Sequence, residues 1–179
     1  MFLFIRKLDN FIISRLTFRS NRRFLDKIMI FSSYLGNGGA VWLLISAFLI
    51  AYEPYRIAGI SVLLSLIVSS IVGEGIIKHY VKRIRPFKAN SSINILITKP
   101  LSYSFPSGHT FSSFAAANML HFYFNNLGII FFILATMIAI SRVYLCVHYT
   151  TDIIAGFILG ITLSQILFTL INYIFIYCT

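Results

Sequence analysis

Charged residues are scarce in this sequence, and acidic ones are the scarcest. Of its 179 residues only 11% are charged, with five Asp and Glu in all, whereas 58% are hydrophobic. Soluble domains carry about 25% charged residues. No polar stretch is long enough to build a second, soluble domain. The composition therefore excludes an ordinary soluble enzyme and predicts a single integral membrane domain.

Cysteine is also rare, since Cys146 and Cys178 are the two in the chain. Two cysteines provide no disulfide framework, so we expect both to be ordinary thiols of a core or an interface. No secretory signal is evident, because Arg6, Lys7 and Asp9 interrupt the first apolar residues and no small-residue cleavage site follows. A disulfide-stabilised secreted protein is therefore not expected.

The charge that is present is mostly positive, and the formal net charge is +10. In a soluble protein this excess would suggest nucleic acid as a partner. Here the basic residues lie between long apolar runs, so membrane lipid headgroups or anionic substrates are the expected partners. Nucleic acid is not expected.

Long uncharged runs predict membrane-spanning helices. A helix needs roughly 20 apolar residues to cross a bilayer, and the runs 28–52 and 153–179 are both longer and free of charge. The expected fold class is all-α, a polytopic membrane helix bundle with five transmembrane helices. The five predicted spans cover residues 28–52, 57–77, 106–124, 127–145 and 151–179.

Residues 1–27 alternate apolar and basic side chains. This pattern predicts an amphipathic interfacial helix that lies on an anionic membrane surface, although a frayed basic tail would have the same composition. We therefore divide the chain into a basic interfacial segment, 1–27, and a membrane-embedded domain, 28–179. Inside the first predicted span, the run Gly36-Asn37-Gly38-Gly39 is expected to kink the helix.

Five spans fix which helix ends share a side of the membrane. The end of the second, the start of the third, the end of the fourth and the start of the fifth must all face the same side. Three cations, a helix N-terminus and two histidines then converge, which suits the binding and transfer of a phosphate group. The converging residues are Lys78, Arg85, Ser107, Gly108, His109, Arg142, His148 and Asp152.

Each of these residues also has a purely structural interpretation. Lys78 and Arg85 could be cations that anchor helices at the interface. His148 could be a buried histidine with satisfied hydrogen bonds, and Asp152 a carboxylate that stabilises a helix N-terminus. Glu74 lies four residues before Lys78, and we interpret it as a partner of that lysine rather than as a catalytic group. A metal site is disfavoured because the cations would repel a divalent ion.

Three motifs make the pattern specific. Lys78-x6-Arg85-Pro86, Pro106-Ser107-Gly108-His109 and Ser141-Arg142-x5-His148-x3-Asp152 resemble the three-part signature of the type 2 phosphatidic acid phosphatase family. That family shares its site with vanadium haloperoxidases. All three parts are complete, ordered and correctly spaced, and the resemblance covers residues 28–175.

The resemblance implies a lipid phosphate phosphatase that needs neither a metal nor another cofactor. By motif position, His148 would be the nucleophile that forms a phosphohistidine, Asp152 would orient it, and His109 would be the general acid. The residues that would hold the phosphate are Lys78, Arg85, Ser107, Gly108 and Arg142.

The resemblance leaves the lipid open among phosphatidic acid, phosphatidylglycerol phosphate and undecaprenyl or another polyprenyl diphosphate. A phosphotransferase would use the same residues, and only its products would differ. A membrane scaffold or lipid transporter with a dead site is disfavoured, because His109, His148 and Asp152 are intact.

The distribution of Lys and Arg predicts which side the site faces. Of the 15 Lys and Arg residues, all but Arg56 lie in the N-terminal segment or at the catalytic end. Positive residues concentrate on the cytoplasmic side of membrane proteins, so a cytoplasmic site is expected. The abundance of Ile, Phe and Asn is typical of AT-rich bacterial genomes, and we therefore expect the plasma membrane of a bacterium.

Overall fold

The structure is a computed structural model that describes residues 2–17 and 22–178, and side chains within 7–16 and 22–174. Every regular element in these residues is helical, which confirms the predicted all-α class. The α-helices are α1 (Phe2–Thr17), α2 (Arg23–Leu35), α3 (Ala40–Ala51), α4 (Arg56–Ser70), α5 (Lys78–Val81), α6 (Pro86–Ala89), α7 (Gly108–Tyr123), α8 (Gly128–Tyr144) and α9 (Thr150–Cys178).

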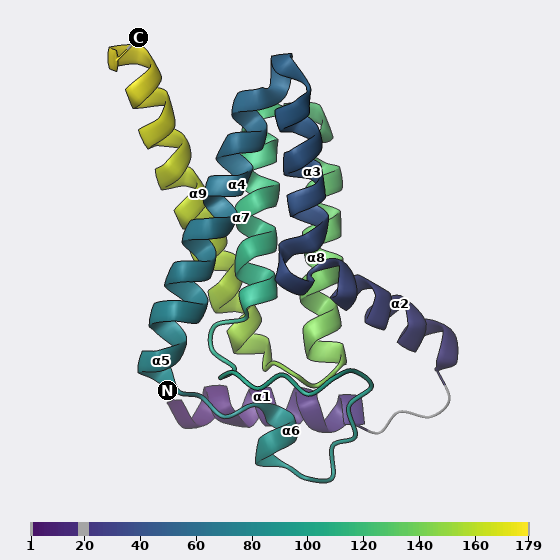
Figure 1. Ribbon diagram of the computed structural model, residues 1–179. Helices are drawn as coiled ribbons and strands as arrows, with labels where there is room; N and C mark the ends of the chain where they lie inside the picture. The colour runs from purple at the N-terminus through teal and green to yellow at the C-terminus, as the bar shows by residue number, and fades with distance from the viewer. Residues whose placement is uncertain (1, 18–21, 179) are drawn as a thin grey trace.

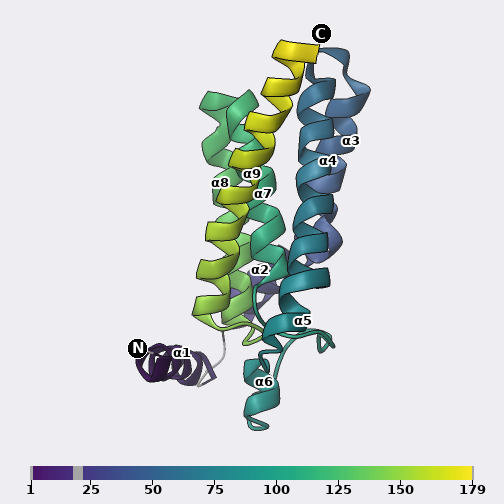
Figure 2. The same ribbon diagram turned by 90° about the vertical axis from the view of Figure 1, so that its left-hand side faces the viewer.

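Helix α7 is the centre of the bundle. It packs against α4, α8 and α9, and these helices run side by side in both views (Figure 1, Figure 2). Its middle residues Ala115, Ala116 and Ala117 are fully buried, because small side chains let neighbouring helices approach closely. On α9 the approach depends on glycine, since a Cβ on Gly160 would lie 2.8 Å from the Phe111 carbonyl oxygen.

Fewer than five helices of the described residues are long and apolar enough to count as full membrane spans. Among the described residues, three helices are long and apolar enough, within Glu53–Ala89, Asn125–Tyr144 and Thr150–Ile174. Helix α7 has 16 residues, which at about 1.5 Å each span about 24 Å and fall short of a hydrocarbon core of about 30 Å. The prediction of five full-length spans is therefore not confirmed.

The first predicted span, 28–52, is broken. Arg23–Leu35 and Asn37–Ala51 meet at an angle of 54°, and the pair gives a fourth span when it is taken as one. Gly38 and Gly39 have φ of 59° and 71° at the break, a left-handed conformation that glycine adopts freely. The predicted kink is thus confirmed. Helix α2 also runs across residue 27, where we placed a domain boundary.

The lower end of the bundle in Figure 1 carries the connections that matter for function. Helix α1 lies across this end, and α6 and the long segment between α5 and α7 lie beside it. The turn Glu53–Tyr55 and the turn Asn125–Leu127 lie at the opposite end. The helix ends that the sequence places on one side of the membrane therefore share one end of the molecule.

Candidate active site

A cavity of about 390 Å³ opens at the end of the bundle where the three motifs of the sequence meet. It is lined by six of the eight residues that the sequence predicts for the site: Lys78, Arg85, Gly108, His109, Arg142 and His148. Ser107 and Asp152 lie behind this lining. The structure thus brings the predicted residues together, six at the cavity wall and two one layer deeper.

Ser107 caps the helix that carries His109. It is fully buried, and its Oγ accepts hydrogen bonds from the Thr110 N–H at 3.4 Å and from Thr110 Oγ1 at 3.0 Å. A serine at this position is the usual cap of a helix N-terminus, so the predicted helix start is confirmed. The Ser107 N–H donates to the Asp152 carbonyl oxygen at 3.1 Å, which ties the starts of α7 and α9 together.

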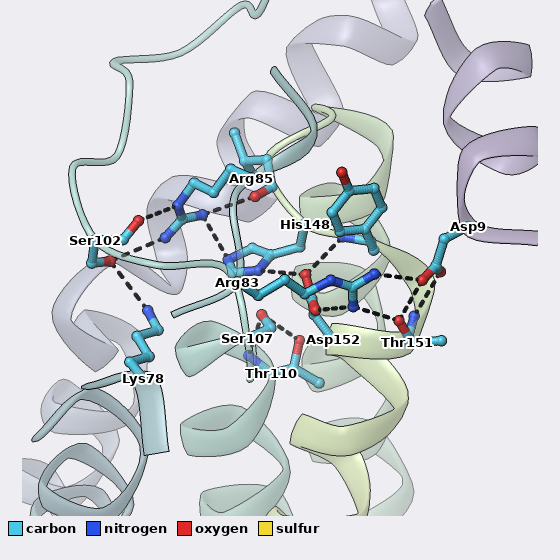
Figure 3. A network of polar contacts seen from close by, with 12 residues as sticks. Asp9, Lys78, Arg83, Arg85, Ser102, Ser107, Thr110, His148, Thr151 and Asp152 are labelled. Carbon is cyan, nitrogen blue, oxygen red and sulfur yellow. Dashed lines mark hydrogen bonds and ion pairs between the residues drawn. The ribbon is translucent and has the colours of Figure 1, made fainter. Parts of the chain in front are cut away.

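Arg85 fixes the tautomer of His148. Its Nη1 donates to the Val147 carbonyl oxygen at 2.8 Å and lies 3.0 Å from His148 Nε2 (Figure 3). A guanidinium has donors and no acceptor, so Nε2 must accept and carry the free lone pair. The ring proton is then on Nδ1, which lies 3.5 Å from Asp152 Oδ2.

Ser102 holds the two cations on this side of the cavity. Its carbonyl oxygen accepts from Arg85 Nε at 2.8 Å, and its Oγ accepts from Arg85 Nη2 at 3.1 Å and from Lys78 Nζ at 3.2 Å (Figure 3). Sequence reasoning missed Ser102, because it lies in an irregular segment without motif or periodicity. No pattern in the sequence indicates this role.

Glu74 is the second partner of Lys78. Its Oε1 lies 2.5 Å from Lys78 Nζ, as predicted from the spacing of four residues. The carboxylate also packs against Gly108, where any Cβ would collide with Glu74 Oε1. A side chain at position 108 would therefore push the flexible end of Glu74 out of this contact.

The opposite wall comes from α2 and the break that follows it. Arg142 Nη1 donates to Ser33 Oγ, while Arg142 Nε has no hydrogen-bond partner among the described residues although the side chain is buried. His109 Nε2 donates to Asn37 Oδ1 at 2.8 Å. Ser33 and Asn37 were missed from the sequence, since the bend that turns them toward the cavity cannot be located by hydropathy.

The carboxylate of Asp152 is fully buried and has both oxygens occupied. Oδ1 accepts from Arg83 Nη1 at 2.7 Å, and Oδ2 accepts from the Tyr149 N–H at 2.9 Å (Figure 3). Arg83 is another residue that sequence reasoning missed, because the motif leaves the six positions between Lys78 and Arg85 unspecified. The helix dipole at the start of α9 adds to the stabilisation of this negative charge.

The electrostatics of the cavity favour an anion. Among its lining residues, Lys78, Arg85 and Arg142 face one carboxylate, Glu74, which leaves an excess of two positive charges. Burial, together with Arg85 and Arg142, lowers the pKa of His148 well below its usual value, so this imidazole is neutral and its Nε2 carries a lone pair, which accepts from Arg85 in this structure. Within the described residues, no group of three His, Cys, Asp or Glu is placed to hold a metal ion.

Comparison with known proteins extends these observations. The model of the PAP2 superfamily matches residues 58–176. An undecaprenyl-diphosphatase of Sulfolobus acidocaldarius is 33% identical over 141 residues, which cover 78% of this chain and 68% of the relative. The range 58–176 that the family model matches includes all three motifs.

Two solved membrane proteins share the fold. A PAP2-type phosphatidylglycerolphosphate phosphatase of Bacillus subtilis superimposes with a TM-score of 0.74 and 25% identity, over 95% of this chain and 87% of that protein. LpxE of Aquifex aeolicus superimposes with a TM-score of 0.72 and 25% identity, over 94% of both chains. The likeness thus covers nearly the whole molecule, well beyond the motifs.

Proposed function

This chain belongs to the PAP2 superfamily and is a membrane lipid phosphatase, and we propose that it acts through a phosphohistidine formed on His148. The proposed substrate is the phosphate monoester or diphosphate of a membrane lipid. Phosphatidylglycerol phosphate and undecaprenyl diphosphate are the candidates that the relatives' names supply, and phosphatidic acid is a third.

The charge of the cavity carries this proposal. Its lining has an excess of two positive charges, which equals the charge of a phosphate monoester dianion. Lys78, Arg85 and Arg142 are each 3% exposed, and burying such cations together is unfavourable unless an anion compensates them. Arg142 Nε, which has no hydrogen-bond partner among the described residues, and the N-terminus of α7 supply donors for the phosphate oxygens.

The first chemical step follows from the tautomer of His148. Its Nε2 attacks phosphorus, a P–N bond forms, and the bond from phosphorus to the lipid oxygen breaks. As the attack begins, the hydrogen bond that Arg85 Nη1 donates to Nε2 is replaced by one to a phosphate oxygen. The Nδ1 proton stays on the ring, where Asp152 stabilises the positive charge that develops. His109, in its protonated form, gives a proton to the departing oxygen, which belongs to the lipid alcohol when the substrate is a monoester and to the lipid monophosphate when it is a diphosphate.

The second step releases phosphate. His109, now neutral, takes a proton from water as the water oxygen attacks phosphorus, and the P–N bond breaks with its electron pair returning to His148 Nε2. The cations that held the first transition state hold the second, because both spread negative charge over the same equatorial oxygens. The enzyme returns to its starting state with inorganic phosphate as the product.

We further propose how the molecule lies in the membrane. The bent pair α2 and α3, the Glu53–Ala89 helix, the short α7, α8 and α9 would make the five spans, with α1 as the interfacial helix of segment 1–27 and residues 28–179 as the phosphatase domain. The excess of Lys and Arg at the catalytic end supports a cytoplasmic site in the plasma membrane of a bacterium.

The experiment that tests the function is phosphate release by the purified protein in detergent, with a chelator present. The substrates are phosphatidic acid, phosphatidylglycerol phosphate, and a polyprenyl diphosphate beside its monophosphate. We expect release from at least one lipid, and complete loss of release in His148→Ala with the fold retained. His79→Ala is the matched control, because His79 is exposed and lies outside the cavity lining.

Normal phosphate release by His148→Ala would reject this residue as the nucleophile. Activity that disappears with the chelator and returns only with added metal would reject the metal-independent mechanism. Consumption of the lipid without free phosphate, with the phosphoryl group found on another alcohol, would make the enzyme a phosphotransferase.

A further inference from the structure

Helix α1 is joined to the catalytic end of the bundle by a buried carboxylate. Its described side chains are mostly exposed, but Asp9 is 0% and Ile13 is 5% exposed. A carboxylate is buried at such a place only when charge and hydrogen bonds compensate it. The sequence shows Asp9 as one acid in a strongly basic segment, and nothing in its spacing indicates a partner.

The partner of Asp9 is Arg83. Arg83 Nη2 lies 2.7 Å from Asp9 Oδ2, while Nη1 of the same guanidinium lies 2.7 Å from Asp152 Oδ1 (Figure 3). Thr151 completes the connection, since its N–H and its hydroxyl donate to Asp9 Oδ1 and Oδ2 at 3.1 and 2.6 Å. The planar fork of an arginine thus bridges the two carboxylates with one nitrogen directed to each.

This bridge controls the oxygen of Asp152 that faces His148. Arg83 holds Oδ1, so the carboxylate cannot rotate, and Oδ2 stays between the Tyr149 N–H at 2.9 Å and His148 Nδ1 at 3.5 Å. The Arg83 guanidinium also stacks over the Tyr149 ring, 4.1 Å from its centroid. Each bond on Arg83 therefore helps to orient the contact between Asp152 and the histidine.

Asp9 also sets the charge of this bridge. With Asp9 present, two carboxylates share one guanidinium, so Asp152 keeps a net negative field toward His148. Without the Asp9 charge, Arg83 and Asp152 would form a neutral pair. Such a neutral pair stabilises the positive charge that develops on His148 less well than the group of Asp9, Arg83 and Asp152, whose net charge is negative.

We propose that Asp9 is a positioning residue for catalysis: acting through Arg83, it keeps the Asp152 carboxylate oriented and negatively charged toward His148. Helix α1 then contributes to catalysis through Asp9, in addition to its proposed position at the membrane surface. This inference rests on the proposed roles of His148 and Asp152.

The test compares three variants of the full-length protein. Asp9→Asn keeps the shape of the side chain and removes its charge. Asp9→Glu restores the charge on a longer side chain. Ile13→Ala is the matched control, because Ile13 is a buried residue of the same helix, in one hydrophobic cluster with Leu145 and Val147, and its side chain has neither a charge nor a hydrogen-bonding group. Thermal unfolding is measured for all three, so that loss of stability is separated from loss of rate.

In Asp9→Asn we expect kcat to fall by about tenfold, the scale of one charge-assisted hydrogen bond, with KM and inhibition by inorganic phosphate unchanged within about twofold. Lys78, Arg85 and Arg142, which bind the phosphate, are untouched by the substitution. Asp9→Glu should recover most of the lost kcat. Ile13→Ala should lower the unfolding midpoint but keep kcat within about twofold of wild type.

A second measurement needs no lipid substrate. Diethyl pyrocarbonate acylates the neutral nitrogen of an imidazole, and mass spectrometry gives the rate at His148 separately from the other histidines. We expect acylation of His148 to slow in Asp9→Asn and to stay near the wild-type rate in Ile13→Ala. This arm decides the role of Asp9 even when no lipid of the panel releases phosphate.

Two results would overturn the inference. One is an Asp9→Asn enzyme whose kcat and His148 acylation rate both match wild type. The other is an equal loss of kcat in Asp9→Asn and Ile13→Ala that follows their loss of stability, which would make Asp9 an anchor for α1 alone. Failure of the wild-type enzyme to release phosphate is a separate outcome, and it would count against the proposed function.

Discussion

At the scale of single residues, the two edges of the His148 ring have opposite neighbours. Arg85 faces Nε2 and Asp152 faces Nδ1, so one edge meets a cation and the other an anion. The ring is also 1% exposed, and burial disfavours its charged form. This arrangement keeps the imidazole neutral before substrate arrives and supports positive charge only once the phosphate is attached.

The lowered pKa of His148 predicts the acid side of the pH profile. Burial first, and the nearby Arg85 and Arg142 next, lower this pKa, so the ring stays neutral and nucleophilic below about pH 6.5, the usual histidine pKa. Activity is then present above the lowered pKa and lost as pH falls through it. We expect the acid limb of the kcat/KM profile, along which His148 takes up a proton, to lie below about pH 6.5.

The substrate phosphate also titrates in this range, and the measurement must separate the two. The profile is therefore recorded with a lipid monophosphate and with a lipid diphosphate, whose phosphate pKa values differ. An acid limb that has the same midpoint with both lipids reports the titration of a group of the enzyme. A shared limb at or above about pH 6.5 would contradict a depressed His148 pKa.

The residues that the sequence reveals are those of the three motifs, and the cavity gathers them because they lie at helix ends. Asp9, Asn37 and Ser102 could not be predicted in the same way. Asn37 reaches His109 only because the chain bends there, and Ser102 lies in an irregular segment. Asp9 depends on how α1 packs against the bundle, which is a tertiary contact without a local pattern.

At the scale of elements, the bend between α2 and α3 shapes the cavity. It brings Asn37 to His109 and Ser33 to Arg142. The backbone at Gly36 is so close to the site that a Cβ there would lie 2.7 Å from Ile138 Cγ2 and 2.8 Å from His109 Cδ2. Real Cβ atoms do not approach other atoms this closely, so glycine is required at this position for a steric reason.

Gly36→Ala is therefore expected to displace His109 or the bend itself. Overpacking of this kind costs about 1–3 kcal/mol of stability, and a displacement of the proposed general acid by about 1 Å is enough to lower the rate by about a hundredfold. We expect the variant to insert and fold with a lower unfolding midpoint, and to lose most of its phosphate release. Thermal unfolding and kcat are measured on the same preparation.

Gly75→Ala is the control for this prediction. Gly75 is also a glycine within a membrane-spanning helix, but a Cβ there meets nothing within 4 Å. It should keep its rate and its stability. Wild-type activity in Gly36→Ala would show that the bend can shift without moving His109, against the expectation.

The elements themselves were partly predictable. Uncharged runs revealed where helices pass through the membrane, and the glycine run at 36–39 revealed the kink. Hydropathy is averaged over a window of residues, however, so it gives the same value for a bent helix pair as for one straight helix. It also does not show that α7 stops after 16 residues at Tyr123, because the apolar pattern continues through Phe124.

At the scale of the whole molecule, the basic residues are concentrated at one end. That end holds α1, the catalytic cavity and the segment between α5 and α7, while the turn at Glu53–Tyr55 lies at the other (Figure 1). Lys78, Arg85 and Arg142 belong to the proposed phosphate site, so we leave them out of this comparison. Many other Lys and Arg residues remain at this end, whereas Arg56 stands alone at the other. This asymmetry supports a cytoplasmic site.

Sidedness can be measured in intact cells that produce the protein, with a membrane-impermeant maleimide. Glu53→Cys and Ser91→Cys each place one thiol at an exposed position, on opposite ends of the bundle. Loss of Glu53 breaks only a surface ion pair with Arg56 at 3.4 Å, which contributes about 0–1 kcal/mol. We expect Glu53→Cys to be labelled in intact cells and Ser91→Cys only after permeabilisation.

The unsubstituted chain gives the background from Cys146 and Cys178, and retained phosphate release shows that each variant is folded. Labelling of Ser91→Cys in intact cells, with Glu53→Cys protected, would reverse the orientation. The consequence reaches the substrate, because a lipid phosphate is accessible only from the leaflet that its headgroup occupies. A cytoplasmic site favours lipid phosphates made in the cytoplasm, such as phosphatidylglycerol phosphate, whereas an external site would favour a polyprenyl diphosphate released on the outer surface.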